Sequence, residues 1–404
     1  MTFYDYSKTI IFEHLKKRLS LSEIISKIKD ASKNGKIAFY PCGVYTREII
    51  NELKVNEPEV FNKIYGCFDK SSDASIGFDI KTFLLNDLSN CKNNISLLIV
   101  ASNTYISKEQ NDIRKFTDFD GKMLCLSNFD NSLSDISPSK IMDKIDAIYN
   151  FLEDDKSKIT YILTWLSRLL NDETIASVFE SEVDKYDFKK PEMYQNYTIK
   201  GIDEINMREL HAKLYQMKYV APEKGNIVFD IGGYKGDTSI YFADQVGLSG
   251  KVYTFEPVKA NFDILLKNIE FNNLTNIIVP INKACSINTG KAKMISGANG
   301  SPWAFLSNDK DASQIDMITI DEFVEKNNIN NVDFIKVDVE GFESKVIEGA
   351  QETIKKFRPN MAICLYHKTR DLYEIPELMS NFNYKQYIRC NMEGPFAINL
   401  FCKY

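Results

Sequence analysis

The stretch Val228-Phe-Asp-Ile-Gly-Gly-Tyr-Lys-Gly-Asp-Thr-Ser239 decides the fold of the C-terminal half of this chain. An apolar strand over 226–231 runs into a glycine-rich turn, and a helix begins near residue 237. Glycine has no Cβ atom, so a ligand can approach the backbone of this turn closely. The order of strand, turn and helix predicts an α/β unit that binds a nucleotide-like cofactor. The predicted cofactor-binding residues of this stretch are Asp230, Gly232, Gly233, Gly236, Asp237 and Thr238.

A carboxylate follows the second strand of this unit, twenty residues beyond Gly236. The strand Lys251–Phe255 is followed by Glu256 and Pro257. An acidic residue at this distance from the glycines is placed to hold both hydroxyls of a ribose. We therefore predict that Glu256 and Pro257 contact the cofactor, together with Ala284. The spacing alone fits a dinucleotide equally well.

Charge favours S-adenosylmethionine over a dinucleotide. A dinucleotide places a pyrophosphate at the N-terminus of the helix, where Asp230 and Asp237 would repel it. S-adenosylmethionine has no phosphate, and its ammonium and sulfonium groups are stabilised by acidic neighbours. Lys235 partly offsets this argument. Two alternatives stay open: a nicotinamide-dependent oxidoreductase, and a binding module that keeps an inactive methyltransferase fold.

The elements that follow complete an α/β series over residues 201–404. Short apolar segments alternate with amphipathic ones, which predicts a parallel sheet covered by helices. No helix fits between the last two strands, Tyr384–Ile388 and Pro395–Lys403, so they should pair antiparallel. A parallel sheet that ends in an antiparallel hairpin is typical of Rossmann-like methyltransferases. Between these parts we expect broken strands and loops over 282–320, including a flexible segment at 296–300.

A second motif reads Asp333-Phe-Ile-Lys-Val-Asp-Val-Glu-Gly-Phe-Glu343. Lys336, Asp338 and Glu340 alternate, so we expect them on one face near the C-terminal end of a strand. Ligands in open α/β sheets bind beyond these strand ends. All three are therefore predicted as catalytic residues. Glu343 opens the next helix, where a favourable charge on the helix dipole explains it at least as well.

These two motifs, with Thr319-Ile-Asp-Glu-Phe323 between them, resemble the FkbM family of methyltransferases. The resemblance covers about residues 200–404 and, more weakly, 155–200. It implies a class I methyltransferase domain that uses S-adenosyl-L-methionine, and O-methylation, often of sugar hydroxyls in glycans or secondary metabolites. The matching positions are Asp230, Gly232, Gly236-Asp237-Thr238, Glu256-Pro257, Asn261-Phe262, Asp321, Lys336–Glu343, Gly349-Ala350, Arg358-Pro359 and Tyr366-His367.

His367 follows the predicted strand Met361–Tyr366, next to the strand that carries Asp338. We predict His367 as the general base, with Asp338 orienting the substrate or the base. The acidic set Asp338, Glu340 and Glu343, with His367, is an alternative metal site, although the prediction is that no metal binds. Trp303 either stacks on a sugar face or is an ordinary packing residue.

The N-terminal half predicts a second, smaller Rossmann-like domain. Strands at 36–40, 63–68, 96–101 and 122–126 alternate with helices at 47–53 and 107–116. We expect an N-terminal helical segment over 1–34 with a helix start at Ser20, this domain over 35–130, and a helical connector over 131–200. A single glycine, Gly43, and Asp69 are weak signs of a nucleotide site. We expect this domain to act as a scaffold or to position substrate.

Composition limits the remaining possibilities. Hydrophobic residues make up 44% of the 404 residues, enough for a packed core. The net charge of −6 offers no basic excess to neutralise phosphates, so no nucleic-acid partner is expected. The eight cysteines form no CxxC pair, and we find no signal peptide or membrane-spanning run. We predict a cytoplasmic enzyme with a small-molecule or glycan acceptor; its oligomeric state and the acceptor itself are left open.

Overall fold

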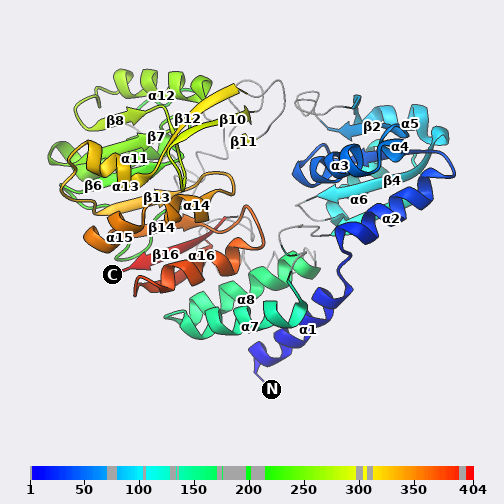
Figure 1. Cartoon of the computed structure of the whole chain (residues 1–404), viewed down its shortest axis with the longest axis horizontal. Coiled ribbons are helices and arrows are strands. Elements are labelled where there is room, and N and C mark those ends of the chain that lie inside the picture. The colour runs from blue at the N-terminus through cyan, green and yellow to red at the C-terminus, as the bar shows by residue number, and fades with distance from the viewer. Residues whose placement is uncertain are drawn as a thin grey trace. The chain divides into compact units, whose positions relative to one another are not determined.

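The computed structural model divides into two compact units, 1–144 with 162–177 and 145–161 with 178–404. Figure 1 shows the elements of both. Some predictions cannot be compared with the structure, because their residues lie outside the described ones. They concern most of the connector segment 171–200, the segment 297–300 and Trp303. The structure describes residues 2–70, 80–102, 106–127, 133, 136–170, 175, 197–201, 214–296, 304–306, 313–390 and 397–404.

The first unit begins with two capped helices, α1 (Phe3–Lys17) and α2 (Leu21–Ser32). The Thr2 side chain accepts a hydrogen bond from the Asp5 N–H, and the Ser20 side chain accepts one from Glu23 N–H. In each helix the acidic side chain also accepts a hydrogen bond from the backbone N–H of the cap residue. Two N–H groups at the helix start are thereby satisfied. The predicted helix start at Ser20 is confirmed.

The first unit holds a five-stranded parallel sheet with the order β3-β2-β1-β4-β5. Alternate residues of β1 point to opposite faces: Ile37 and Phe39 pack with α2 and α3, and Ala38 and Tyr40 pack with α5 and α6. The four predicted strands are confirmed, and the short β3 is an addition. The elements are β1 (Lys36–Tyr40), α3 (Val44–Asn56), α4 (Pro58–Phe61), β2 (Ile64–Asp69), β3 (Thr82–Leu84), α5 (Leu88–Cys91), β4 (Ile95–Ser102), α6 (Ile106–Phe116) and β5 (Met123–Ser127).

The second unit is built on a seven-stranded sheet with the order β15-β16-β14-β13-β6-β7-β8. Five strands are parallel, and β16 runs antiparallel to both β14 and β15. The predicted antiparallel hairpin and the Rossmann-like fold are confirmed. The strands are β6 (Ile227–Ile231), β7 (Lys251–Phe255), β8 (Ile278–Ile281), β13 (Phe334–Val337), β14 (Asn360–Cys364), β15 (Lys385–Cys390) and β16 (Ile398–Lys403).

The helices of this unit cover the sheet, and its chain order reverses between β6 and β13 (Figure 1). That reversal is the switch point where open α/β sheets bind ligands. The helix that Glu343 opens ends at Glu348, and a second helix begins at Gln351. Gly349 between them packs against Ser286, whose carbonyl oxygen would lie 2.1 Å from a Cβ at this position. The helices are α11 (Asp237–Val246), α12 (Lys259–Phe271), α13 (Ile320–Lys326), α14 (Glu343–Glu348), α15 (Gln351–Phe357) and α16 (Asp371–Ser380).

The region predicted as broken strands and loops forms a separate four-stranded sheet, with the order β11-β10-β12-β9. Its strands are β9 (Ala284–Cys285), β10 (Gly290–Ser296), β11 (Ala304–Leu306) and β12 (Ser313–Ile318). Met294 and Ile315 of this sheet form a small apolar cluster with Val258, which lies in the turn that follows β7.

Two helices of the predicted connector, α7 (Pro138–Phe151) and α8 (Asp155–Leu170), each contribute residues to both units. In the second unit, Ser157 Oγ accepts from the Ile388 N–H, and Arg389 pairs with Asp154. These contacts attach the start of α8 to the edge strand β15. No helix among the described residues has the length and apolar content needed to cross a bilayer.

Candidate active site

The site begins with a buried ion pair beneath the glycine turn. Lys336 on β13 lies opposite Asp230 on β6, and its Nζ is 3.2 Å from Asp230 Oδ1. Lys336 also donates to the Gly232 carbonyl, and Asp230 Oδ2 accepts from Thr238 Oγ1 (2.8 Å) and Ser239 Oγ (2.7 Å). Both charged side chains are inaccessible to solvent. Three residues predicted for the site, Asp230, Thr238 and Lys336, therefore form a network that shapes the turn.

This network modifies the charge argument made from the sequence. Lys336 neutralises Asp230, so that carboxylate adds no net negative charge to the turn. Asp237, in the first turn of α11, is also buried. Burial raises its pKa to about 6, assisted by Asp230 and opposed by Lys336. The acidic character of the turn thus depends on Asp237 and Glu256.

The glycines of the turn are required by the packing of the protein itself. Gly232 has φ +86°, and a Cβ there would lie 1.7 Å from the Asp338 carbonyl oxygen. A Cβ on Gly233 would lie 2.1 Å from Thr254 Cγ2, and Gly236 has φ +90°. The turn therefore has one conformation fixed by its neighbours, which presents its backbone to a ligand without rearrangement.

Glu256, after β7, is almost fully buried beside this turn. Its Oε2 accepts from the Tyr234 N–H (3.0 Å), and its Oε1 accepts from the Val258 N–H (2.8 Å). Burial raises the pKa of Glu256 to about 7, although these N–H groups and Lys336 favour the ionised form. The Asn261 side chain also donates to this carboxylate, so one acceptor position is left for a ligand. The next residue, Pro257, is partly buried, and Ala284 packs against the small cluster that contains Val258.

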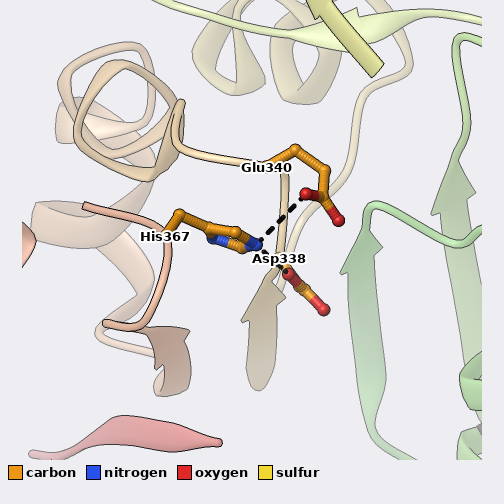
Figure 2. Close-up of side chains that lie close together, drawn as sticks. All are labelled: Asp338, Glu340 and His367. Atoms are coloured by element: carbon orange, nitrogen blue, oxygen red, sulfur yellow. Dashed lines mark ion pairs between the residues drawn. The ribbon is translucent and has the colours of Figure 1, made fainter. Parts of the chain in front are cut away.

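Three of the four residues predicted as catalytic converge beyond the ends of β13 and β14 (Figure 2). His367 Nε2 lies 3.6 Å from Asp338 Oδ1 and 3.5 Å from Glu340 Oε2. The expectation of one shared strand face is wrong for Glu340, because β13 ends at Val337. Glu340 instead lies in a turn with a left-handed backbone, φ +55°. Lys336 is not part of this cluster, because it is committed to Asp230 and Gly232.

Glu343 orients the histidine. Its side chain is fully buried, and Oε1 lies 2.9 Å from His367 Nδ1. The same oxygen accepts from the N–H groups of Val339 (2.9 Å) and Gly341 (3.3 Å), which fixes the turn that carries Glu340. The sequence suggested a charge on the helix dipole, with membership of an acidic set around His367 as the alternative. The structure adds a contact that directs Nε2 toward Asp338 and Glu340.

Asp338 is held by two tyrosines, of which Tyr366 belongs to the matched pair Tyr366-His367 and Tyr215 to no motif. Tyr215 donates to Asp338 Oδ2 at 2.6 Å, and Tyr366 donates to the same oxygen at 3.0 Å. Burial opposes ionisation of Asp338, but Lys336, His367 and the two hydroxyls keep its pKa below the usual value. Asp338 is therefore ionised, with Oδ1 directed to His367.

The carboxylates around His367 make its imidazole more basic. Burial favours neutral His367, but Glu343 and Glu340 hold its pKa well above the usual value. Asp371, in the first turn of α16, is also buried, and burial with the charge of Glu343 raises its pKa to about 7.

The comparisons agree with this architecture. Residues 230–386 match the Methyltransferase FkbM domain, which confirms the resemblance found in the sequence. Hexuronic acid methyltransferase AglP from Haloferax volcanii is 22% identical over 245 residues, covering 60% of this chain and 95% of that protein. The crystal structure of the methyltransferase FkbM from Methylobacillus flagellatus KT is similar over 97% of this chain and 93% of that chain. Its TM-score of 0.51 at 14% identity shows a shared fold.

Proposed function

Residues 230–386 form an FkbM methyltransferase domain, and we propose that it transfers a methyl group from S-adenosyl-L-methionine to a hydroxyl of a sugar. One juxtaposition supports this proposal most. The buried carboxylate of Glu256, beside a rigid glycine turn, and the Asp338–Glu340–His367 cluster lie at ends of strands of one sheet. The first suits a ribose, and the second suits an acceptor hydroxyl.

The residues present fit the methyl donor. Glu256 follows the second strand of the unit and can still accept a hydrogen bond, as a residue that holds a ribose hydroxyl must. Three glycines in the turn over 232–236 leave room for a ligand beside the backbone, and Asp237 adds negative charge for a cationic ligand. S-adenosylmethionine supplies a methyl group activated by a positively charged sulfur. We assign Glu256 to the ribose and the turn to the rest of the donor.

The cluster fits the acceptor. A sugar hydroxyl is a weak nucleophile at neutral pH, so a positioned group must take up its proton as the new bond forms. Glu343 holds Nδ1 of His367, which leaves Nε2 to face the acceptor with Asp338 and Glu340. With protein groups alone, we assign proton uptake to Nε2 and orientation of the hydroxyl to Asp338.

The acceptor class comes from the relative in Haloferax volcanii, which is named for hexuronic acid. We propose a uronic-acid sugar, free or within a glycan, as the acceptor of this chain. The first unit, with its own Rossmann-like sheet, would position this acceptor rather than catalyse a second reaction. A cytoplasmic location remains the expectation drawn from the sequence.

Radiolabelled methyl transfer tests this function. The full chain is incubated with S-adenosyl-L-[methyl-³H]methionine and either methyl glucuronide, methyl galacturonide or methyl glucoside. We expect label on a uronide and little on the glucoside. Mild alkali then separates the two possible products, because it hydrolyses a methyl ester and leaves a methyl ether. Alkali-stable label supports a hydroxyl acceptor, and alkali-labile label would move the acceptor to the carboxylate.

A further inference from the structure

We propose that Asp338, Glu340 and His367 bind a divalent cation that holds and activates the acceptor hydroxyl. The binding site follows from the geometry of these three residues alone. Its role in activation rests on the function proposed above. In this arrangement His367 does not accept the proton, because its Nε2 binds the cation.

The three side chains have the geometry of a metal site. One ligand atom from each residue lies within 4.8 Å of the other two, and the groups face a common point (Figure 2). Nε2 is 3.6 Å from Asp338 Oδ1 and 3.5 Å from Glu340 Oε2. Adjacent ligands around a cation with bonds of about 2.1 Å lie about 3 Å apart, so small side-chain movements complete the site. One imidazole with two carboxylates suits Mn²⁺, Fe²⁺ or Zn²⁺ better than Ca²⁺.

Two buried atoms without a hydrogen-bond partner mark the position of the ligand. Asp338 Oδ1 and His367 Nε2 make no hydrogen bond within the part of the chain that is described; His367 Nδ1 makes none either, but it faces Glu343 Oε1 at 2.9 Å. Buried polar atoms almost always have a partner, and here both point to the same place. A cation bound by Oδ1 and Nε2 would satisfy both atoms at once.

The charges around this place are unbalanced. Asp338, Glu340 and Glu343 surround one imidazole, and Lys336 is already paired with Asp230. Lys368 adds one positive charge and donates from Nζ to the Gly341 carbonyl, and Asp371 adds a further carboxyl. The carboxyl groups still outnumber the basic side chains here, and buried charges require compensation. A divalent cation would supply it.

Neighbouring residues hold Asp338 and His367 through atoms other than the two that would bind the cation. Glu343 lies against Nδ1 of His367, and the hydroxyls of Tyr215 and Tyr366 bind Oδ2 of Asp338. Metal-ligating histidines and carboxylates are oriented in this way, through the atom that does not bind the metal. Three protein ligands leave open positions on the cation for oxygens of the sugar.

Methyl transfer at such a site needs no histidine base. A cation that binds the acceptor oxygen lowers the pKa of the hydroxyl, and its proton passes to solvent. The oxygen forms a bond to the methyl carbon as the carbon–sulfur bond breaks. The sulfur keeps the bonding electron pair and leaves as a neutral thioether.

Titration of the full chain with Mn²⁺ at neutral pH, followed by calorimetry and electron paramagnetic resonance, tests the site without an acceptor. We expect one Mn²⁺ per chain. Glu340→Gln and His367→Ala should each weaken binding at least tenfold. Glu343→Gln should weaken it by about 10–100-fold, as for other outer contacts of metal ligands. The control variants Glu348→Gln, on α14, and His14→Ala, on α1, should leave Mn²⁺ affinity unchanged.

S-adenosylhomocysteine binding, measured in the same samples, shows that each variant is folded and separates the two proposals. If wild-type chain binds S-adenosylhomocysteine but no Mn²⁺, Mg²⁺ or Zn²⁺, the metal site is refuted and the methyltransferase function stands. Equal Mn²⁺ affinity in wild type and His367→Ala would also refute it. Failure of the function would look different: the chain would bind Mn²⁺ at this site but no S-adenosylhomocysteine.

Discussion

Lys336 and Asp230 pair 3.2 Å apart across the neighbouring strands β13 and β6, directly under the glycine turn. The pair connects the two sequence motifs of the domain. Through Gly232 and the hydroxyls of Thr238 and Ser239, it also sets the shape of the turn. Lys336 thus supports the proposed donor site, and the proposed acceptor cluster begins two residues later, at Asp338.

Replacement of Lys336 tests this structural role. Lys336→Met would leave Asp230 charged, buried and without its cation, which typically costs about 3–5 kcal/mol in the free energy of unfolding. Urea denaturation should show this loss, together with weaker S-adenosylhomocysteine binding. Lys259→Met, in an exposed pair with Asp263 on α12, is the control and should change neither quantity. A variant as stable as wild type would contradict the role given to Lys336.

Gly232 tests the rigidity of the turn. Gly232→Ala places a Cβ 1.7 Å from the Asp338 carbonyl oxygen and adds the strain of φ +86°. The contact is with backbone, so the turn must move away from Asp338. We expect a lower melting temperature and loss of S-adenosylhomocysteine binding. Gly43→Ala, where a Cβ meets nothing within 4 Å, should retain binding. Normal binding by Gly232→Ala would mean that the turn does not hold the donor.

The raised pKa of Glu256, about 7, predicts a pH dependence of donor binding. Ribose hydroxyls donate to the ionised carboxylate, so binding favours loss of the Glu256 proton. Affinity should therefore rise as pH increases through 7, by up to about tenfold per pH unit below that value, and level off above it. Calorimetry between pH 5.5 and 8.5 measures this trend. Glu256→Gln, which cannot ionise, should flatten it; a slope that persists in this variant belongs to another group.

We expect His367 to be required in both proposals, as proton acceptor or as metal ligand. His367→Ala should lower turnover by about 10²–10⁴-fold, the usual contribution of general acid–base catalysis. Binding of S-adenosylhomocysteine should persist, because Glu256 and the turn do not contact His367. Single-turnover transfer to methyl glucuronide measures the effect, with His14→Ala as the matched histidine control. Near-normal turnover would remove His367 from the reaction.

Strands with strong apolar character could be predicted from the sequence. The strands β1 and β7 have the predicted bounds, and the antiparallel partners β15 and β16 follow from the short segment between them. The strand β3 was missed because three residues show no periodicity. The sheet over 284–318 was missed because its strands are short and β12 exposes alternate polar residues.

The site was predictable where its residues share a motif. Asp338, Glu340 and His367 follow strand ends, and parallel strand ends meet at one edge of a sheet. Tyr215 lies 123 residues before Asp338 in sequence and belongs to no motif, so its contact depends on tertiary structure. The contacts of Lys336 with Asp230 and of Glu343 with His367 could not be predicted, because strand register and helix entry decide these partners and neither is visible in a single motif.

The central claim is that Glu256 and the glycine turn bind S-adenosylmethionine. Isothermal titration of S-adenosylmethionine into wild type and Glu256→Ala at pH 8 tests it most directly, with Glu270→Ala on the surface of α12 as the matched control. Wild type and Glu270→Ala should bind with equal affinity, and Glu256→Ala should bind about 1.5–3 kcal/mol more weakly, the value of a charge-assisted hydrogen bond. Absence of binding by the wild type, or equal affinity in all three proteins, would contradict the account.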